Sequence, residues 1–337
     1  MASSTDTPRS TSGRKTLVTG AGGFIASHLV ELLVRQGRTV RAFVRYNSRD
    51  DRGWLDRIDP AVATEVDVFV GDLVNADAVA SAVSGCEDVF HLGALIPIPY
   101  SYRHPREFVA ANVVGTLNVL EALRRTDVDP LVHVSSSEVY GSAQTLPMSE
   151  DHRLHPQSPY AATKVSADQL VLSYVRSFGL RAVIARPFNT YGPRQSARAV
   201  IPTIVTQALT GDHVQLGSVH PTRDFLYVAD TAAGIARCAE VDDAIGEVVN
   251  LGTGREISIA EVVERVLAAV ARELPVVLAE ERQRPPESEV DRLCAAADKA
   301  RELLGWEATV PFEDGLQRTI DWIASSLDTY RPATYSL

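Results

Sequence analysis

The segment that most restricts the fold is a glycine-rich turn near the N-terminus, between a strand pattern and a helix pattern. The apolar run Lys15–Thr19 predicts a buried strand, and the turn that follows reads Gly20-Ala21-Gly22-Gly23. Beyond the turn, apolar residues recur at helical spacing at Ile25, Leu29, Leu32 and Leu33. A strand, a glycine turn and a helix in succession indicate a βαβ unit whose helix N-terminus can bind a phosphate.

Further apolar runs continue this pattern along the first half of the chain. They are Thr39–Val44, Glu65–Val70, Asp88–Leu92, Leu131–Ser135 and Arg181–Arg186. Amphipathic periodicity predicts helices over Pro105–Arg125 and Pro159–Phe178. Apolar strands that alternate with helices are typical of a parallel sheet covered on both faces. We therefore predict an α/β chain with a Rossmann-type doubly wound sheet that binds ligands at the carboxyl ends of its strands.

After about Arg186 the alternation becomes irregular, and a smaller mixed C-terminal lobe is expected. Phe188–Arg198 is a loop rich in Gly, Pro and Asn. Helices are expected over Ala199–Thr210, Val228–Ala239, Ser258–Glu273, Ala296–Leu304 and Phe312–Ser325, with extended pieces at His213–Leu216 and Glu247–Asn250. We expect a disordered tail at 1–14, a dinucleotide-binding domain at 15–187 and a mainly substrate-binding lobe at 188–330. Segments near 213–257 are candidates to return to the sheet.

Charge and segment composition disfavour several functions. Lys and Arg total 33 against 43 Asp and Glu, a net charge of −10, so a nucleic-acid partner or an anionic membrane surface is not expected. No apolar run reaches the roughly 20 residues of a membrane span, and the N-terminus lacks the apolar core of a signal peptide. The cysteines, Cys86, Cys238 and Cys294, are expected to be buried thiols in a reducing cytoplasm. His152 and His155 are interpreted as part of a solvated connector, so no metal site is expected.

The glycine turn predicts a site for the pyrophosphate of a dinucleotide. Gly20 and Gly23 let the backbone approach the phosphates, and the helix that begins near Phe24 and Ile25 offers its first amides. Ala26 stands where a G-x-x-G-x-x-G pattern has its third glycine, and a small residue there is compatible with close helix packing.

The second and third strand candidates bear on which dinucleotide is bound. Arg45 stands near the end of the second strand, where an acidic residue would bind the ribose 2′-hydroxyl. NAD is expected, and NADP stays open because Arg45 could contact a 2′-phosphate. Asp72 and Leu73 follow the third strand, and Asp72 could accept a hydrogen bond from the adenine amine. A simple turn role for Asp72 is the alternative.

A possible reacting group lies on the helix predicted over Pro159–Phe178. Tyr160 and Lys164 are four residues apart and therefore share one helix face. A tyrosine beside an ammonium and an oxidised nicotinamide can have its pKa lowered toward neutrality. It could then accept a proton from a sugar hydroxyl while a hydride leaves the same carbon. Ser136, Ser137 and Glu138 follow the preceding strand, where catalytic groups of such sheets lie.

The motifs together resemble those of a known family. They are TGAGGFIASHLV, GDL, HLGA, SSSEVYG, SPYAATK, RPFNTYGPRQ, RDFLYV, NLGTG and RPPESEV, and they run from about residue 15 to 320. The chain resembles an extended short-chain dehydrogenase/reductase of the nucleotide-sugar epimerase/dehydratase group. Within that group it is most similar to 4,6-dehydratases of UDP-N-acetylhexosamines in legionaminic-acid-type pathways.

The resemblance implies a nucleoside-diphosphate-sugar substrate and residues that bind it. Asn189 and Arg223 stand where the family contacts the sugar nucleotide and its diphosphate, and Arg284 is the implied second diphosphate cation. Val200 and Ile201 would flank the nucleobase. Two arginines on an otherwise acidic chain suit a bidentate grip on a diphosphate.

The resemblance also implies a reaction. Tyr160 and Lys164 would form the pair that oxidises C4, with Ser136 orienting the sugar oxygen, and Glu138 would remove the C5 proton before water is lost and hydride returns to C6. Epimerisation at C4 or C5 stays open, and Glu138 as an ion-paired edge residue is the structural alternative. Ser137 replaces the acid found in dTDP-glucose dehydratases, which keeps decarboxylation of a UDP-uronic acid open.

Decarboxylation would require an extra arginine on the substrate carboxylate, and Arg194 or Arg198 could supply it. A non-catalytic nicotinamide-sensing module is an alternative of another class, disfavoured because both Tyr160 and Lys164 are present. The family pairs the helices expected at 105–125 and 159–178 across a two-fold axis. A homodimer built on a four-helix bundle is therefore expected.

Overall fold

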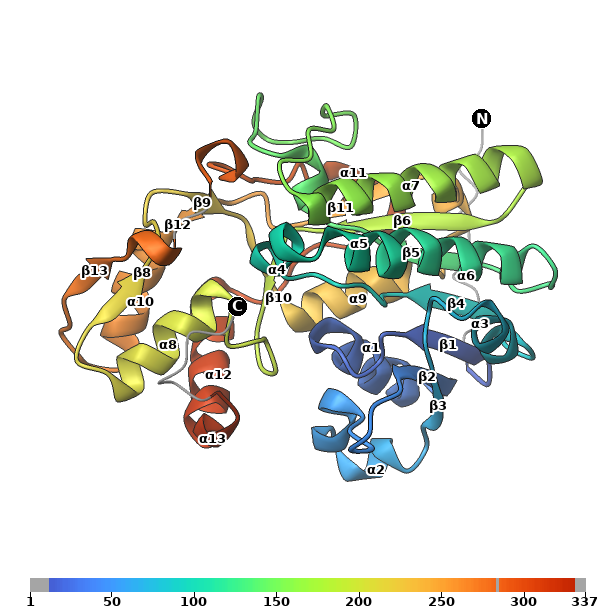
Figure 1. The fold of residues 1–337 in the computed structure, drawn as a ribbon, viewed down its shortest axis with the longest axis horizontal. Coiled ribbons are helices and arrows are strands. Elements are labelled where there is room, and N and C mark those ends of the chain that lie inside the picture. Colours follow the sequence, from blue (N-terminus) through green and yellow to red (C-terminus); the bar gives the residue numbers. More distant parts are fainter. Residues whose placement is uncertain (1–11, 283–284, 331–337) are drawn as a thin grey trace.

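The computed structural model describes residues 12–282 and 285–330. In these ranges a sheet of seven parallel strands forms the centre of the larger domain, in the order β11-β6-β5-β4-β1-β2-β3 (Figure 1). The strands are β1 (Lys15–Thr19), β2 (Thr39–Arg45), β3 (Asp67–Gly71), β4 (Asp88–His91), β5 (Leu131–Val134), β6 (Ala182–Pro187) and β11 (Val248–Leu251). Strand order reverses between β1 and β4, and this doubly wound sheet confirms the predicted Rossmann-type class.

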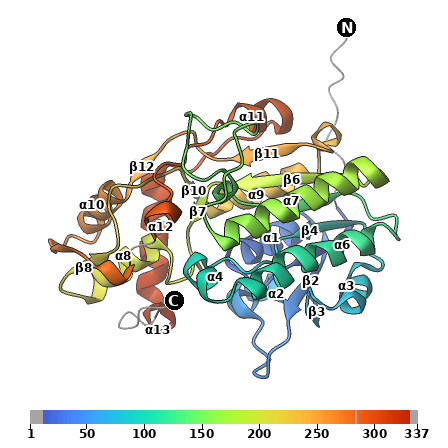
Figure 2. The same cartoon turned by 45° about the horizontal axis from the view of Figure 1, so that its top comes forward.

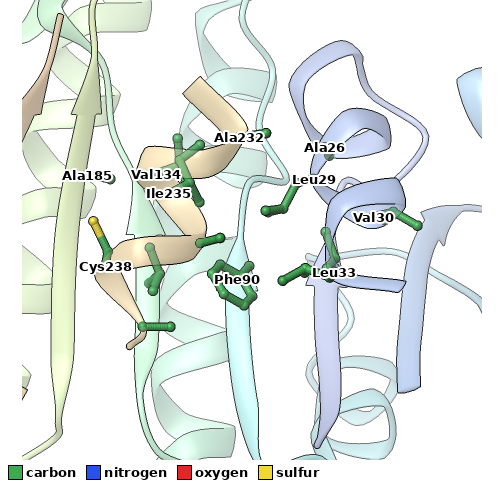
Figure 3. Packing of buried hydrophobic residues seen from close by; sticks show 14 of the residues in the cluster. Ala26, Leu29, Val30, Leu33, Phe90, Val134, Ala185, Ala232, Ile235 and Cys238 are labelled. Carbon is green, nitrogen blue, oxygen red and sulfur yellow. The ribbon is translucent and has the colours of Figure 1, made fainter. Parts of the chain in front are cut away.

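Two helices from distant parts of the sequence cover one face of this sheet. They are α1 (Phe24–Arg35) and α9 (Val228–Cys238), which lie against each other. Figure 3 shows Leu29 and Leu33 of α1 and Ile235 of α9 directed at Phe90 of β4 and Val134 of β5. Burying one such side chain contributes about 1.5–3 kcal/mol, so the segment after residue 188 helps to hold the seven-stranded sheet together.

The opposite face carries α3 (Ala76–Val83), α6 (Gly115–Leu123) and α7 (Pro159–Phe178), with α6 and α7 side by side (Figure 2). The helix expected over 105–125 is not uniform. It comprises α5 (Pro105–Phe108), a π-helical segment (Val109–Val114) and α6. Such π segments often occur at functional sites, and this one turns a buried asparagine toward α7.

The smaller lobe has its own core between α8 (Val200–Thr210), α10 (Ile259–Ala269) and α12 (Phe312–Ser325). In its described part, short strands pair as β7 (Asn189–Tyr191) with β10 (Phe225–Tyr227), β8 (Val214–Leu216) with β13 (Val276–Leu278), and β9 (Thr222–Arg223) with β12 (Ile257–Ser258). The remaining short helices are α2 (Pro60–Ala63), α4 (Ile98–Arg103), α11 (Asp298–Leu304) and α13 (Leu327–Tyr330).

Some of the local structure differs from expectation. Most of the expected disordered tail lies outside the described residues, but Arg14 is ordered and donates a 2.7 Å hydrogen bond to the Asp129 carbonyl. His152 is buried, which corrects its interpretation as part of a solvated connector. Its Nε2 atom accepts a hydrogen bond from the Gln144 amide at 3.1 Å. The three cysteines are free buried thiols, as predicted.

Candidate active site

The glycine turn forms a close-packed cradle at the carboxyl end of β1. Gly20 has a φ of 66°, and a Cβ atom there would lie 2.6 Å from the Cα of Gly93 in the loop after β4. Gly23 precedes α1 without any side-chain cap, so the first-turn amides of Phe24 and Ile25 have no side-chain acceptor at the cap. Ala26 is buried in the sheet core. A side chain at Gly20 would collide with the Gly93 backbone, so glycine is needed for the turn to pack this closely. The N-terminus of α1 attracts an anion, and the arrangement therefore fits a dinucleotide pyrophosphate.

The residues expected near the adenosine lie at the same edge of the sheet. Arg45 is the last residue of β2 and is exposed. Asp72 follows β3, is exposed, and accepts a hydrogen bond from the Val74 amide at 3.1 Å, so one of its oxygens has the turn role. Leu73 lies beneath it, and its carbonyl accepts from the side chain of Asn118 at 2.8 Å.

The expected catalytic pair lies in the first turns of α7. The Ser158 hydroxyl caps this helix by accepting from the Ala161 amide at 3.1 Å. Tyr160 and Lys164 are both buried, and the Lys164 Nζ donates to the Val134 carbonyl at the end of β5 at 2.8 Å. The Tyr160 ring stands edge-on to Phe108 with centroids 6.3 Å apart. The sheet end and the apolar wall therefore fix both side chains.

The protein environment shifts the pKa of Tyr160 in the direction opposite to the one expected from Lys164. Burial raises the pKa of Tyr160 to about 12; a hydrogen bond with Ser136 lowers it, and the carboxylates of Glu138 and Asp168 raise it further. Burial also lowers the pKa of Lys164 to about 8 against the attraction of Asp168. The phenol is therefore protonated at neutral pH in the protein alone.

Ser136, Ser137 and Glu138 lie on the turn after β5. Ser136 precedes a 3₁₀ helix (Ser137–Tyr140), and its hydroxyl accepts from the Glu138 amide at 3.2 Å. Ser137 is buried, whereas Glu138 is partly exposed. Within the described ranges, no hydrogen bond or ion pair engages the Glu138 carboxylate, although its charge acts on Tyr160. The structure therefore does not support an ion-paired edge residue.

The expected sugar-nucleotide residues lie on the smaller lobe, with different degrees of access. The Oδ1 atom of Asn189 is buried and has no hydrogen-bond partner among the described residues, as expected of a group that accepts from a ligand. Val200 begins α8 and is partly exposed, but the Ile201 side chain is buried in the lobe core and is not open to a base. Arg223 is buried, with its Nη2 3.6 Å from Glu289. Arg284 lies outside the described residues.

Hydrogen bonds join the smaller lobe to the segment that leads into α7. The Gln157 Nε2 atom donates to the carbonyl of Glu289, the ion-pair partner of Arg223, at 2.9 Å. Ser288 donates to the Gln157 carbonyl, and its hydroxyl also meets the Tyr102 hydroxyl on α4 at 2.5 Å. Because Gln157 lies three residues before Tyr160, these bonds connect the Arg223 region to the start of α7, where the expected catalytic tyrosine lies.

Arg194 does not have the role that sequence reasoning left open for it. It has a φ of 69°, and its Nη2 lies 2.6 Å from the Glu31 carboxylate on α1. Its Nη1 donates to the Ser27 hydroxyl at 3.2 Å. These contacts attach the loop after β7 to the cofactor helix and keep the Arg194 guanidinium from a substrate carboxylate.

Sequence reasoning missed one buried polar residue beside the pair. Asn112, in the π-helical segment, accepts from the Leu95 amide at 2.7 Å and donates to the Thr163 hydroxyl at 3.0 Å. It therefore links the loop after β4 to the residue just before Lys164. A polar side chain within an apolar helical stretch was the available signal.

The described residues lack a metal-ligand cluster and a membrane-spanning helix. No group of three or more His, Cys, Asp or Glu side chains there could hold a metal ion. In the same ranges, no helix has the length and apolar character needed to cross a membrane.

Comparison with known proteins identifies relatives along nearly the whole chain. Residues 17–319 match the family described as GDP-mannose 4,6 dehydratase. The dTDP-glucose 4,6-dehydratase of Streptomyces antibioticus is 35% identical over 326 residues, which are 94% of this chain and 94% of the relative.

Solved structures of epimerases have the same architecture. UDP-glucuronic acid 4-epimerase from Bacillus cereus, in complex with UDP-glucuronic acid and NAD, is 28% identical with a TM-score of 0.84, covering 93% of this chain and 99% of that one. UDP-N-acetylglucosamine 4-epimerase from Methanobrevibacter ruminantium M1, in complex with UDP-N-acetylmuramic acid, is 27% identical with a TM-score of 0.85, covering 94% and 99%.

Proposed function

The chain belongs to the extended short-chain dehydrogenase/reductase family of nucleotide-sugar dehydratases and epimerases, and from this membership we propose that it is a nucleotide-sugar 4,6-dehydratase. The observation that carries the proposal is the Glu138 carboxylate, which no hydrogen bond or ion pair engages among the described residues and whose charge acts on the buried Tyr160. A C4 epimerase needs no base at C5, whereas a 4,6-dehydratase does.

The cofactor proposed is NAD, with NADP as the alternative because Arg45 is exposed at the end of β2. Gly20, Gly23 and the first turn of α1 would hold its pyrophosphate, and Lys164 would lie near its nicotinamide half. When bound, the dinucleotide supplies the hydride acceptor for a sugar carbon. The B. cereus relative, whose structure contains NAD, supports this assignment.

The first proton transfer is assigned to Tyr160. Its phenolate would accept the proton of the sugar C4 hydroxyl, and the Ser136 hydroxyl would hold that oxygen in line. Because burial raises the pKa of Tyr160 to about 12, the phenolate requires positive charge nearby. Lys164, one helical turn further along α7, is proposed to provide it.

The second proton transfer is assigned to Glu138. A ketone at C4 acidifies the C5 hydrogen, and the Glu138 carboxylate would remove that proton. The C6 hydroxyl then leaves with a proton as water. Since the Ser137 hydroxyl is a poor acid at neutral pH, Glu138 would return its proton to the leaving hydroxyl, which balances the step without a further acid.

The substrate proposed is a nucleoside-diphosphate hexose, with a UDP-N-acetylhexosamine as the leading class. Asn189 offers an unpaired buried amide oxygen, and Arg223 and Arg284 would bind the diphosphate. Val200 would contact the base through its side chain, and Ile201 only through its backbone. The division into a cofactor domain at 15–187 and a substrate lobe at 188–330 is part of this proposal, with α9 and β11 returning to the sheet.

The rival reactions have less support in the site. Epimerisation at C4 is the activity named for the two relatives of solved structure described above, but it leaves Glu138 without a role. Decarboxylation of a uronic acid requires a cation for the carboxylate; Arg194 is engaged by Glu31, so Arg198, which is exposed in the same loop, would have to supply it.

Incubation with UDP-N-acetylglucosamine and other nucleotide sugars in deuterated water tests the proposed function. We expect a 4-keto-6-deoxy product that has lost one water and carries one deuterium at C5. Exchange at C5 without loss of water would replace dehydration with C5 epimerisation, and a C4 epimer that carries no deuterium at C5 would replace it with C4 epimerisation. Carbon dioxide release from a UDP-uronic acid would establish a decarboxylase.

A homodimer through α5, α6 and α7 is also proposed. Much of the apolar face expected on the first helix, including Phe108 and Leu120, is in the core. Val109, Val114 and Phe178 nevertheless remain 48%, 40% and 54% exposed on this side of the molecule. These residues lie in the region where the family pairs its helices.

Sedimentation velocity at micromolar concentration should therefore give a dimer. Val114→Glu should shift it to monomer because a buried, unpaired charge is costly at an interface. Val277→Glu on β13, at a similarly exposed apolar position of 43%, should leave the dimer intact. A monomeric wild-type protein would refute this assembly.

A further inference from the structure

Three consecutive residues at the end of β5 bind three successive turns of α7. The Val134 carbonyl accepts from Lys164 at 2.8 Å, and the Ser135 hydroxyl donates to the Asp168 Oδ2 atom at 2.9 Å. The next residue, Ser136, is hydrogen-bonded to Tyr160. Asp168 therefore continues the helix face of the catalytic pair by one more turn, at i+4 from Lys164.

Asp168 is fully buried and bound from several elements. Its Oδ2 atom accepts from the Arg186 Nε and Nη2 atoms at 3.1 and 2.9 Å, in addition to Ser135. Its Oδ1 atom lies 3.4 Å from the Nε2 atom of His133 on β5. Burial alone would raise the pKa of Asp168, but the contact with the His133 side chain and the charges of Arg186 and Lys164 outweigh burial and lower it. The group is thus a carboxylate.

The charges around Lys164 determine how much the Asp168 carboxylate matters for the protonation of Lys164. Titratable and charged side chains from several elements surround Lys164, Tyr160 and Asp168. They are these three residues on α7 themselves, His91 on β4, His133 on β5, Arg186 on β6 and Glu138 after β5. Burial lowers the pKa of His133 to about 4 and that of His91 well below its usual value, so both are neutral near pH 7. Arg186 therefore pairs directly with the buried Asp168 carboxylate, and the charge of Lys164 interacts with the same anion.

We propose that Asp168 is a positioning residue whose carboxylate, shared between Arg186 and Lys164, keeps Lys164 protonated. An arginine retains its proton in proteins, whereas a buried lysine readily loses one. Removing the Asp168 charge would leave the buried Lys164 and Arg186 without this anion, and Lys164 is the one of the two that can become neutral. The catalytic consequence rests on the proposed function, because Lys164 there favours the Tyr160 phenolate.

The chain makes this proposal directly measurable because it has only three lysines, Lys15, Lys164 and Lys299. Labelling the lysine side chains with ¹³C at Cε gives three NMR signals to titrate, and Lys164→Met assigns one of them by its loss. Lys15 and Lys299, each partly exposed near an acidic residue, serve as internal references.

Asp168→Asn keeps the side-chain shape and should lower the titration midpoint of Lys164 by about one to three pH units. Ser135→Ala removes one hydrogen bond to Asp168 but keeps its charge, and should leave the midpoint nearly unchanged. Arg186→Met removes the competing cation and should raise the midpoint. This opposite shift keeps the test informative if the Asn variant does not fold.

The inference would be overturned if the titration midpoint of Lys164 in Asp168→Asn equals that of the wild type. It would also be overturned if the Lys164 midpoint in Arg186→Met does not rise. In a turnover assay, the activity of Asp168→Asn should decline at lower pH than that of the wild type, because Lys164 becomes neutral earlier. The NMR titration requires no substrate. It can therefore fail or succeed independently of the proposed dehydration.

Discussion

Replacing Tyr160 by phenylalanine is expected to reduce turnover of the nucleotide sugar by about 10² to 10⁴-fold, the usual contribution of a positioned acid–base group. The ring packs edge-on against Phe108 in a buried wall, so phenylalanine preserves the apolar contacts. Only the hydroxyl and its bond to Ser136 are lost. Steady-state kinetics measures kcat, and thermal unfolding checks that the fold is unchanged.

Tyr46→Phe is the matched control, because that tyrosine is exposed at the end of β2 and its hydroxyl has no proposed role. Its kcat should stay near the wild-type value. Tyr160→Phe with more than about a tenth of wild-type turnover would remove the phenol from the mechanism, since the effect would lie below the usual range. With an oxidised nicotinamide bound that lowers the pKa of Tyr160 from about 12 to below that of Lys164, wild-type activity should rise with pH as the phenol ionises and fall as Lys164, with a pKa of about 8, loses its proton.

The parallel sheet and the tyrosine–lysine pair could be predicted because both depend on local patterns. Buried strands appear as apolar runs, and a four-residue spacing fixes a shared helix face wherever the helix packs. The glycine turn was equally readable, since a positive φ at Gly20 and the close approach of Gly93 favour glycine. These features require no knowledge of what lies across the fold.

Features that depend on contacts between distant segments could not be predicted. Arg194 stands in a Gly/Pro-rich loop that suggests solvent, yet its partner Glu31 is 163 residues away in the sequence. Asp168 lies on an amphipathic helix where a carboxylate normally faces water, and only the packing of α7 on β5 and β6 buries it against Arg186. Tyr160 shows the same limit for electrostatics. Its spacing from Lys164 suggests a lowered pKa, but burial, which the sequence does not reveal, raises the pKa of Tyr160 in the protein alone.

Glu138→Gln is the substitution that should separate oxidation from elimination. Glutamine keeps nearly the same size but cannot accept the C5 proton, so formation of the 4-keto-6-deoxy product should fall by about 10² to 10⁴-fold. Oxidation at C4 depends on Tyr160, Lys164 and Ser136 and should continue. The intact sugar would then accumulate in its 4-keto form on the enzyme, and borodeuteride should trap it with deuterium at C4.

Glu302→Gln provides the control, because it changes an exposed carboxylate on α11, away from the proposed site, and should dehydrate substrate at the wild-type rate. If Glu138→Gln loses water from the sugar as fast as the wild type, another group removes the C5 proton and Glu138 is not the base. If trapping finds no 4-keto sugar while elimination has stopped, Glu138 is needed for the first step as well. The Glu138 charge acts on Tyr160, so these outcomes also show whether the two proton transfers are independent.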